Sequence, residues 1–192
     1  METVVRWVVF GVWVFWLLRY WQGGLTAWGH LQEAQSRLDR GLMAVIGFCS
    51  LVLTLACLAF LLRPLAAIAI FAPFYFALAG AGLVIAGVAG TFYSRSVLGG
   101  YWTADTCVQP EHHIVEHGPY ARVRHPIYGA AILIFLGMGM AFPHAWVWAA
   151  VVVAVLAYLV KTVDEDRFMT AHLPGYAEYR RRVRYRLIYG LW

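Results

Sequence analysis

Five apolar stretches separate the polar parts of this sequence. They cover about residues 4–18, 42–62, 65–93, 127–142 and 145–160, and polar side chains gather between and after them. A helix needs about 20 apolar residues to cross a hydrocarbon core about 30 Å thick. The second and third stretches are long enough by themselves, whereas the other three are shorter. The pattern is typical of a chain that crosses a membrane several times.

This pattern predicts an all-α, polytopic membrane protein with about five transmembrane helices in a single domain, residues 1–192. Three of the helices belong to residues 1–93. A polar loop, a helical hairpin and an amphipathic tail belong to residues 94–192. The hairpin turns at Phe142-Pro143-His144, and a single re-entrant element is the alternative for its two arms. We expect Pro73 to kink the third helix, because proline removes a helical hydrogen bond.

Two details refine these helices. No small-residue cleavage site follows the first stretch, so we expect a retained membrane span and not a signal peptide. Gly82, Ala86 and Gly90 fall on one face of the third helix. Small residues at this spacing allow a neighbouring helix to approach closely, which predicts that this face is a packing surface.

Composition and charge support a membrane protein and give it an orientation. Hydrophobic residues make up 62% of the chain and charged residues 13%, against about 25% charged residues in globular proteins. A five-span chain places 12 of the 15 Lys and Arg residues on one side, in residues 21–40, 94–126 and 161–192. Positively charged loops face the cytoplasm. We therefore expect the two long loops and the tail to be cytoplasmic.

The tail combines arginines with an apolar stripe. Pro174-Gly175 is expected to divide it into two short helices. In the second, Tyr176, Tyr179, Val183 and Leu187 follow helical spacing among five arginines. A basic amphipathic helix of this kind either lies on anionic headgroups or folds as a lid over a cytoplasmic pocket.

Polar residues that could take part in catalysis or ligand binding gather in two clusters, residues 95–128 and residues 161–167. In a five-span chain both clusters lie at the same membrane surface, so we expect them to share one site. His125 precedes Pro126, and proline is favoured in the first turn of a helix. The sequence thus predicts His125 at the start of the fourth helix, at the boundary between water and lipid.

The first cluster contains the pattern His-x-Ile-Val-x-x-Gly-Pro-Tyr-x-x-Val-Arg-His-Pro-Ile-Tyr, which ends at Tyr128. It resembles the core motif of the isoprenylcysteine carboxyl methyltransferases, which belong to a wider group of membrane methyltransferases that includes phospholipid N-methyltransferases. Residues 164–168 resemble the paired-acid motif of that family, and residues 176–183 resemble its closing motif. The resemblance extends over about residues 95–188.

The resemblance implies an enzyme that transfers a methyl group from S-adenosyl-L-methionine to a lipophilic acceptor, leaving S-adenosyl-L-homocysteine. It makes residues 94–192 the region of the cofactor-binding loop, hairpin and tail. It implies that the cofactor is bound by His112, His113, Ile114, Val115, Tyr120, His125, Pro126, Ile127, Tyr128, and Glu165 or Asp164. The implied catalytic residues are His125, Lys161 and Glu165, with no metal ion.

The chemical nature of the acceptor determines which residue takes part in the reaction. A carboxylate acceptor is ionised at neutral pH, so Lys161 would only steer it. An amine acceptor must lose a proton, and His125 or Glu165 is then the candidate base. We expect a lipophilic small molecule or lipidated substrate entering from the bilayer, with membrane lipid and not nucleic acid as the surrounding partner.

Other functions are compatible with parts of the sequence. The main alternative is a phosphatidylethanolamine-type N-methyltransferase, and a non-catalytic membrane scaffold is a further one. A zinc site is a third possibility, because Cys107, His112, His113 and His117 lie close together in the sequence. Their spacing fits no common zinc module.

Overall fold

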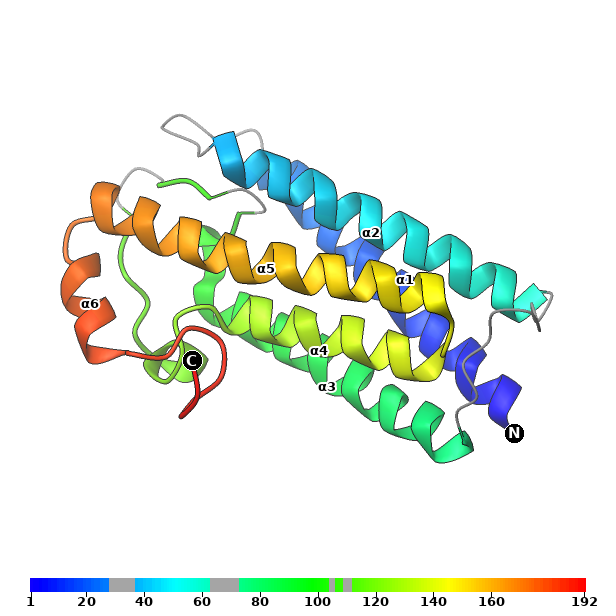
Figure 1. Cartoon of the computed structure of the whole chain (residues 1–192). Helices are drawn as coiled ribbons and strands as arrows, with labels where there is room; N and C mark the ends of the chain where they lie inside the picture. Colours follow the sequence, from blue (N-terminus) through cyan, green and yellow to red (C-terminus); the bar gives the residue numbers. More distant parts are fainter. Residues whose placement is uncertain (28–36, 63–72, 104–105, 109–111) are drawn as a thin grey trace.

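The chain forms a bundle of long helices with one short helix at its end (Figure 1). The computed structural model describes residues 1–27, 37–62, 73–103, 106–108 and 112–192. The described residues contain no β-strand, only one isolated bridge between Val123 and Tyr185. The predicted all-α fold is therefore confirmed.

Six α-helices make up the described fold. They are α1 (Glu2–Ala27), α2 (Arg37–Leu62), α3 (Phe74–Leu98), α4 (Pro126–Ala141), α5 (Ala145–His172) and α6 (Tyr176–Arg182). Two 3₁₀ turns, η2 (Gly99–Tyr101) and η3 (Gly118–Ala121), lie between α3 and α4. Within the described ranges, α1, α2, α3 and α5 are long and apolar enough to cross a membrane. The 16 residues of α4 extend about 24 Å, which is less than the hydrocarbon thickness.

The predicted helix limits need correction at several ends. The first helix continues to Ala27, well beyond residue 18. Pro73 does not kink the third helix but precedes it, in extended conformation at the N-cap; residues 65–72 of that stretch lie outside the described residues. The fifth helix continues through the polar residues after 160 and ends at His172. In the tail, α6 ends at Arg182, because the backbone turns extended at Val183.

The tightest helix contact joins α3 to α4, and it uses different glycines from those predicted. A Cβ atom at Gly80 would lie 2.6 Å from the carbonyl oxygen of Gly137, and one at Gly87 would lie 2.6 Å from that of Ala130. Gly82, in contrast, faces open space, and Gly90 meets only the Cβ of Ala130, at 3.2 Å. The packing face therefore lies elsewhere on the helix than the sequence spacing indicated.

Large buried side chains fill the centre of the bundle. Trp13, Phe135 and Tyr158 are fully or almost fully buried, and the rings of Trp13 and Phe135 meet edge to face at 5.3 Å. The indole nitrogen of Trp13 donates a hydrogen bond of 2.9 Å to Thr54 Oγ1, which ties α1 to α2. Many large apolar side chains point outward instead, as expected where lipid and not water surrounds the bundle.

The chain direction alternates along the bundle, which sorts its connections between two ends (Figure 1). One end holds the N-terminus and the turn of three residues that joins α4 to α5, as predicted for the hairpin. The other end holds α6, the segment between α3 and α4, and the last turns of α5. The two polar clusters of the sequence thus lie at the same end, which confirms that they can share a site.

Candidate functional site

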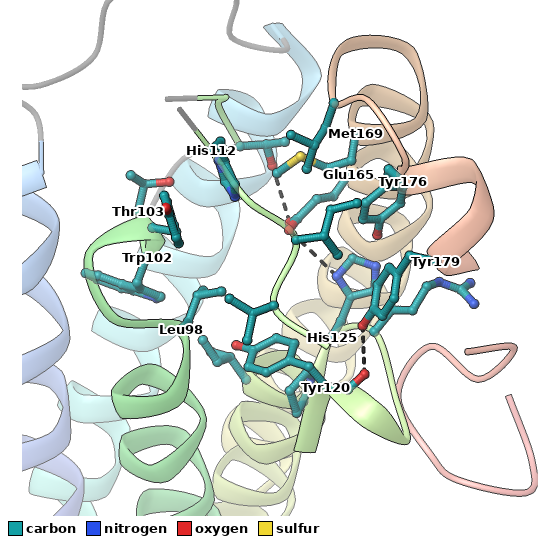
Figure 2. A pocket seen from close by; sticks show the side chains of 18 of the residues that line it. Leu98, Trp102, Thr103, His112, Tyr120, His125, Glu165, Met169, Tyr176 and Tyr179 are labelled. Atoms are coloured by element: carbon teal, nitrogen blue, oxygen red, sulfur yellow. Dashed lines mark hydrogen bonds and ion pairs between the residues drawn. The ribbon is translucent and has the colours of Figure 1, made fainter. Parts of the chain in front are cut away.

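A pocket opens at this end of the bundle, between α3, the segment that follows it, α5 and α6 (Figure 2). It encloses about 770 Å³ of empty space, part of which is open to solvent. Its lining residues are Leu98, Tyr101, Trp102, Thr103, Thr106, Cys107, His112, Ile114, Val115, Tyr120, Arg124, His125, Pro126, Ile127, Tyr128, Glu165, Met169, Leu173, Tyr176 and Tyr179.

Glu165 is the acidic residue of this lining. It lies on α5, and its side chain is 18% exposed. Its Oε2 accepts hydrogen bonds from the hydroxyls of Tyr128 and Thr106, the latter at 3.4 Å. Its Oε1 lies 3.7 Å from Nδ1 of His125. The carboxylate is thus oriented by neutral hydroxyl groups while remaining accessible from the pocket.

Asp166, the next residue on α5, is buried and accepts hydrogen bonds from the donors around it. Arg124 binds it with two parallel hydrogen bonds, from Nε to Oδ1 at 3.0 Å and from Nη2 to Oδ2 at 2.7 Å. His125 Nε2, Tyr176 Oη and Arg186 Nε also lie within 2.8–3.0 Å of its oxygens. A bidentate arginine–carboxylate pair fixes both distance and orientation. Asp166 therefore locks the pocket wall, α6 and the last residues into one arrangement.

The ring of His125 is held from two sides. Its Nε2 lies 3.0 Å from Oδ1 of Asp166, and its Nδ1 lies on the Glu165 side of the pocket, 3.7 Å from Oε1. The ring also stacks on Tyr128, with centroids 5.6 Å apart and an interplanar angle of 9°. His125 lies at the N-cap of α4, directly before Pro126, as the sequence predicted.

Helix α6 covers the pocket. Leu173, Tyr176 and Tyr179 are buried and pack with the partly buried Ile114. Gly175 begins this helix in left-handed conformation, with φ of +82°, which glycine adopts without steric cost. Tyr179 donates a 2.9 Å hydrogen bond to the carbonyl of Tyr120. Of the two predicted arrangements of the tail, the lid over a pocket is the one that these contacts support.

Burial also determines the ionisation of the phenols in the covering helix. Burial raises the pKa of Tyr176 well above its usual value, and the neighbouring Asp166 charge adds to this rise. Burial likewise raises the pKa of Tyr179 and of Tyr120. All three side chains are therefore neutral near pH 7 and serve as hydrogen-bond donors and aromatic surfaces.

His112 forms the opposite wall. Its ring stacks on Tyr101, with centroids 4.7 Å apart and an interplanar angle of 15°. Burial lowers the pKa of His112, and the neighbouring His113 lowers it further, although Glu165 opposes this effect. The ring is therefore neutral near pH 7 and offers a flat aromatic surface to a ligand.

The structure brings together most of the residues that the sequence assigned to cofactor binding. Those lining the pocket are His112, Ile114, Val115, Tyr120, His125, Pro126, Ile127, Tyr128 and Glu165. His113 is exposed and outside the lining, with its ring edge toward Tyr101. Asp164 lines a separate groove on the outer side of α5. Of the two acids considered for the cofactor, Glu165 is the one that reaches the pocket.

Lys161 is also absent from the lining. Its side chain is completely buried, and its Nζ donates to Asp39 Oδ1 and, at 3.3 Å, to Thr106 Oγ1. Contact with an acceptor would require these bonds to break. Its assignment as an acceptor-steering residue stays a prediction.

Several residues of the site were not predicted from the sequence. Thr106, Met169, Tyr176 and Tyr179 line the pocket, and Asp166 organises its wall. The apolar stripe of the tail was a signal for the two tyrosines. Asp166 lies in the segment that resembles the paired-acid motif, but its role in the wall could not be predicted, because it depends on partners that lie 10 to 42 residues away.

The proposed zinc ligands do not converge. Among the described residues, no three His, Cys, Asp or Glu side chains form a group that could hold a metal ion. Cys107 instead lies 3.4 Å from the hydroxyl of Thr103.

The lining is suited to an organic cation with an aromatic part. Six aromatic side chains, those of Tyr101, Trp102, Tyr120, Tyr128, Tyr176 and Tyr179, line the pocket together with one carboxylate. Aromatic faces attract cations, by about 0.5–2 kcal/mol for each contact, and an accessible carboxylate pairs with an ammonium group. This donor and acceptor set fits S-adenosyl-L-methionine, which carries a sulfonium, an ammonium group and a purine.

Comparison with known proteins agrees with the geometry. Residues 80–171 match the isoprenylcysteine carboxyl methyltransferase (ICMT) family. Over 70 residues the chain is 39% identical to the cobalt-zinc-cadmium resistance protein CzcN of Cupriavidus metallidurans, and this match covers 36% of the chain and 32% of CzcN. The chain therefore spans about a third of the length of this curated relative. The part of the chain that contains His125, Glu165 and Asp166, residues 80–171, is thus similar to the isoprenylcysteine carboxyl methyltransferase family.

Proposed function

We propose that the protein is an S-adenosyl-L-methionine-dependent methyltransferase that modifies a lipophilic acceptor at the cytoplasmic face of its membrane. The observation that carries this proposal is the position of Glu165, an accessible carboxylate in a pocket lined by six aromatic side chains. The family match supports the reaction type. The pocket lies at the end of the bundle where water-borne and membrane-borne ligands can both arrive.

In this proposal Glu165 binds the ammonium group of the methyl donor. The aromatic side chains of α6, Tyr176 and Tyr179, shield the donor from water, and the flat surface of His112 with the apolar Ile114 accommodates the purine. The donor supplies an electrophilic methyl group on its sulfonium. Methyl transfer is an in-line displacement, so the main contribution of the protein is alignment, which can be worth about 7–11 kcal/mol.

The topology we propose has five crossings, with α4 as the short fourth one. In support, α4 lies alongside α3 and leads from the pocket end to the opposite end of the bundle (Figure 1). A short helix can be accommodated by local thinning of the bilayer. Most Lys and Arg residues then lie at the pocket end, and the positive-inside rule favours the cytoplasm for that end.

The acceptor we propose is a carboxylate on a lipidated or lipid-like molecule, following the family resemblance. A phospholipid amine is the second candidate. It is favoured by the position of His125, whose Nδ1 lies on the Glu165 side of the pocket and would be the base that accepts the proton an amine must lose.

Two experiments test these proposals in sequence. Calorimetry of the purified, detergent-solubilised protein with S-adenosyl-L-homocysteine tests the donor site, and an absence of binding would reject a methyltransferase. Labelled S-adenosyl-L-methionine is then supplied with prenylcysteine or with phosphatidylethanolamine in vesicles. We expect label on prenylcysteine, and label on phosphatidylethanolamine alone would replace the carboxylate acceptor with the amine.

A further inference from the structure

A lysine lies one helical turn before the pocket carboxylate without pairing with it. Lys161 and Glu165 are four residues apart on α5, a spacing at which oppositely charged side chains normally attract each other. Glu165 has no Lys or Arg partner within ion-pair distance among the residues that the structure describes. The lysine one helical turn away therefore leaves the carboxylate uncompensated, and another group must hold that lysine in place.

Asp39 holds it. This residue lies in the first turn of α2 and is 1% exposed. Its Oδ1 accepts a hydrogen bond from Nζ of Lys161, and the pair is buried. A buried ammonium group without a partner is strongly disfavoured, so the position of Lys161 depends on this carboxylate from another helix.

The same aspartate positions a second residue against Glu165. Asp39 Oδ2 accepts a hydrogen bond of 2.7 Å from the backbone N–H of Thr106. The hydroxyl of Thr106 accepts from Lys161 at 3.3 Å and donates to Glu165 Oε2 at 3.4 Å. A hydroxyl has one proton to donate and lone pairs to accept, so all of these bonds can exist together.

We propose that Asp39 is a positioning residue for the methyl-donor site: it retains Lys161 in a buried ion pair and thereby keeps Glu165 available for the ammonium group of the donor. Without the Asp39 charge, Lys161 pairs with Glu165 and competes with that ammonium group. The inference rests on the proposed function. It also assigns a role in the site to α2, which lies outside the family match over residues 80–171.

The test compares two ligands on one set of variants. S-adenosyl-L-homocysteine carries the ammonium group, whereas methylthioadenosine shares the purine and ribose but lacks the amino-acid part. Asp39→Asn keeps an acceptor for the N–H of Thr106 and removes the charge. We expect it to weaken binding of S-adenosyl-L-homocysteine by roughly tenfold and to change the affinity for methylthioadenosine by less than about twofold.

Removing the competing cation must reverse the effect. We expect Asp39→Asn combined with Lys161→Met to bind S-adenosyl-L-homocysteine within about threefold of wild type. In turnover assays Asp39→Asn should raise KM for the donor more than it lowers kcat. Arg40→Gln is the matched control, because Arg40 is the exposed neighbour of Asp39 on α2, and it should leave both affinities unchanged.

The outcomes separate the inference from the proposed function. Equal weakening of both ligands by Asp39→Asn, or no rescue by the double variant, would show a general structural role and overturn the inference. If Asp39→Asn alone does not fold, Asp39→Asn combined with Lys161→Met decides, because it removes both buried charges: it must retain the affinity for S-adenosyl-L-homocysteine, and a loss of more than about fivefold would contradict the proposal. Failure of the wild-type protein to bind either ligand would reject the donor site itself.

Discussion

Two neighbouring acids on α5 have different environments and different consequences. Asp166 is almost completely buried and binds four side chains, whereas Glu165 keeps part of its surface open to the pocket. Successive residues of a helix point about 100° apart, which turns one carboxylate inward to the protein and the other toward a ligand. Asp166 therefore connects parts of the protein to one another, and Glu165 is left available to a molecule in the pocket.

The two candidate acids for the donor can be separated at this scale. We expect Glu165→Gln to weaken binding of S-adenosyl-L-homocysteine by roughly 10- to 100-fold, since hydrogen bonds to charged groups contribute about 1.5–3 kcal/mol. Asp164→Asn is the matched control, because Asp164 lies in the groove on the outer side of α5. Calorimetry on both variants measures the difference, and a larger loss for Asp164→Asn would exchange their roles.

At the scale of elements, α6 is attached to the bundle by contacts of unequal strength. Its exposed contact joins Arg182 to Glu116. Its buried contact runs from Tyr176 to Asp166, beside the paired Arg124. Water screens an exposed ion pair, which therefore contributes little, whereas a hydrogen bond to a charged group contributes about 1.5–3 kcal/mol. The covering helix is therefore held chiefly from inside.

Hydrogen exchange can measure this attachment. We expect Asp166→Asn to increase amide exchange throughout α6 and to lower thermal stability in detergent, because Arg124 loses its carboxylate partner. Arg182→Gln should change both by little, since its ion pair is exposed to solvent. Equal protection of α6 in the two variants would mean that the apolar contacts of Leu173 and Tyr179 hold the helix without Asp166.

The contact between α3 and α4 makes a second prediction for elements. Gly87→Ala places a methyl group 2.6 Å from a backbone oxygen of α4, and overpacking of this kind costs about 1–3 kcal/mol. Gly82→Ala meets nothing within 4 Å and should leave thermal stability unchanged. A thermal unfolding scan of the two variants shows which face of α3 packs against α4. Equal stability of the two variants would mean that the face with Gly87 is not the packing face.

These elements also show what sequence reasoning could reach. Hydropathy located the helices, and the motif ending at Tyr128 located His125 and part of the pocket lining. The limits of α5 were missed because Lys161, Glu165 and their neighbours are polar, so the helix seemed to end with its apolar stretch. The pairing of Lys161 with Asp39 could not be predicted, since contacts between residues 122 positions apart depend on how the helices pack.

For the whole molecule, the proposed orientation is open to a direct test. All three native cysteines are buried, so an introduced cysteine reports its own side of the membrane. We expect Arg180→Cys, in α6, to react with a membrane-impermeant maleimide only in inverted vesicles. Thr3→Cys, at the opposite end of the bundle, should react in intact cells. The reverse pattern would place the pocket outside the cytoplasm.

The unbroken length of α5 has a consequence for the lipids that surround the protein. Its 28 residues extend about 42 Å, about 12 Å more than a typical hydrocarbon core. The distance along the helix from Glu165 to the turn between α4 and α5 is therefore fixed and does not change with the length of the lipid acyl chains. In a thicker bilayer the membrane surface lies closer to the pocket, and in a thinner bilayer it lies farther from the pocket. Turnover of a membrane-borne acceptor should accordingly pass through a maximum as acyl-chain length increases in reconstituted vesicles.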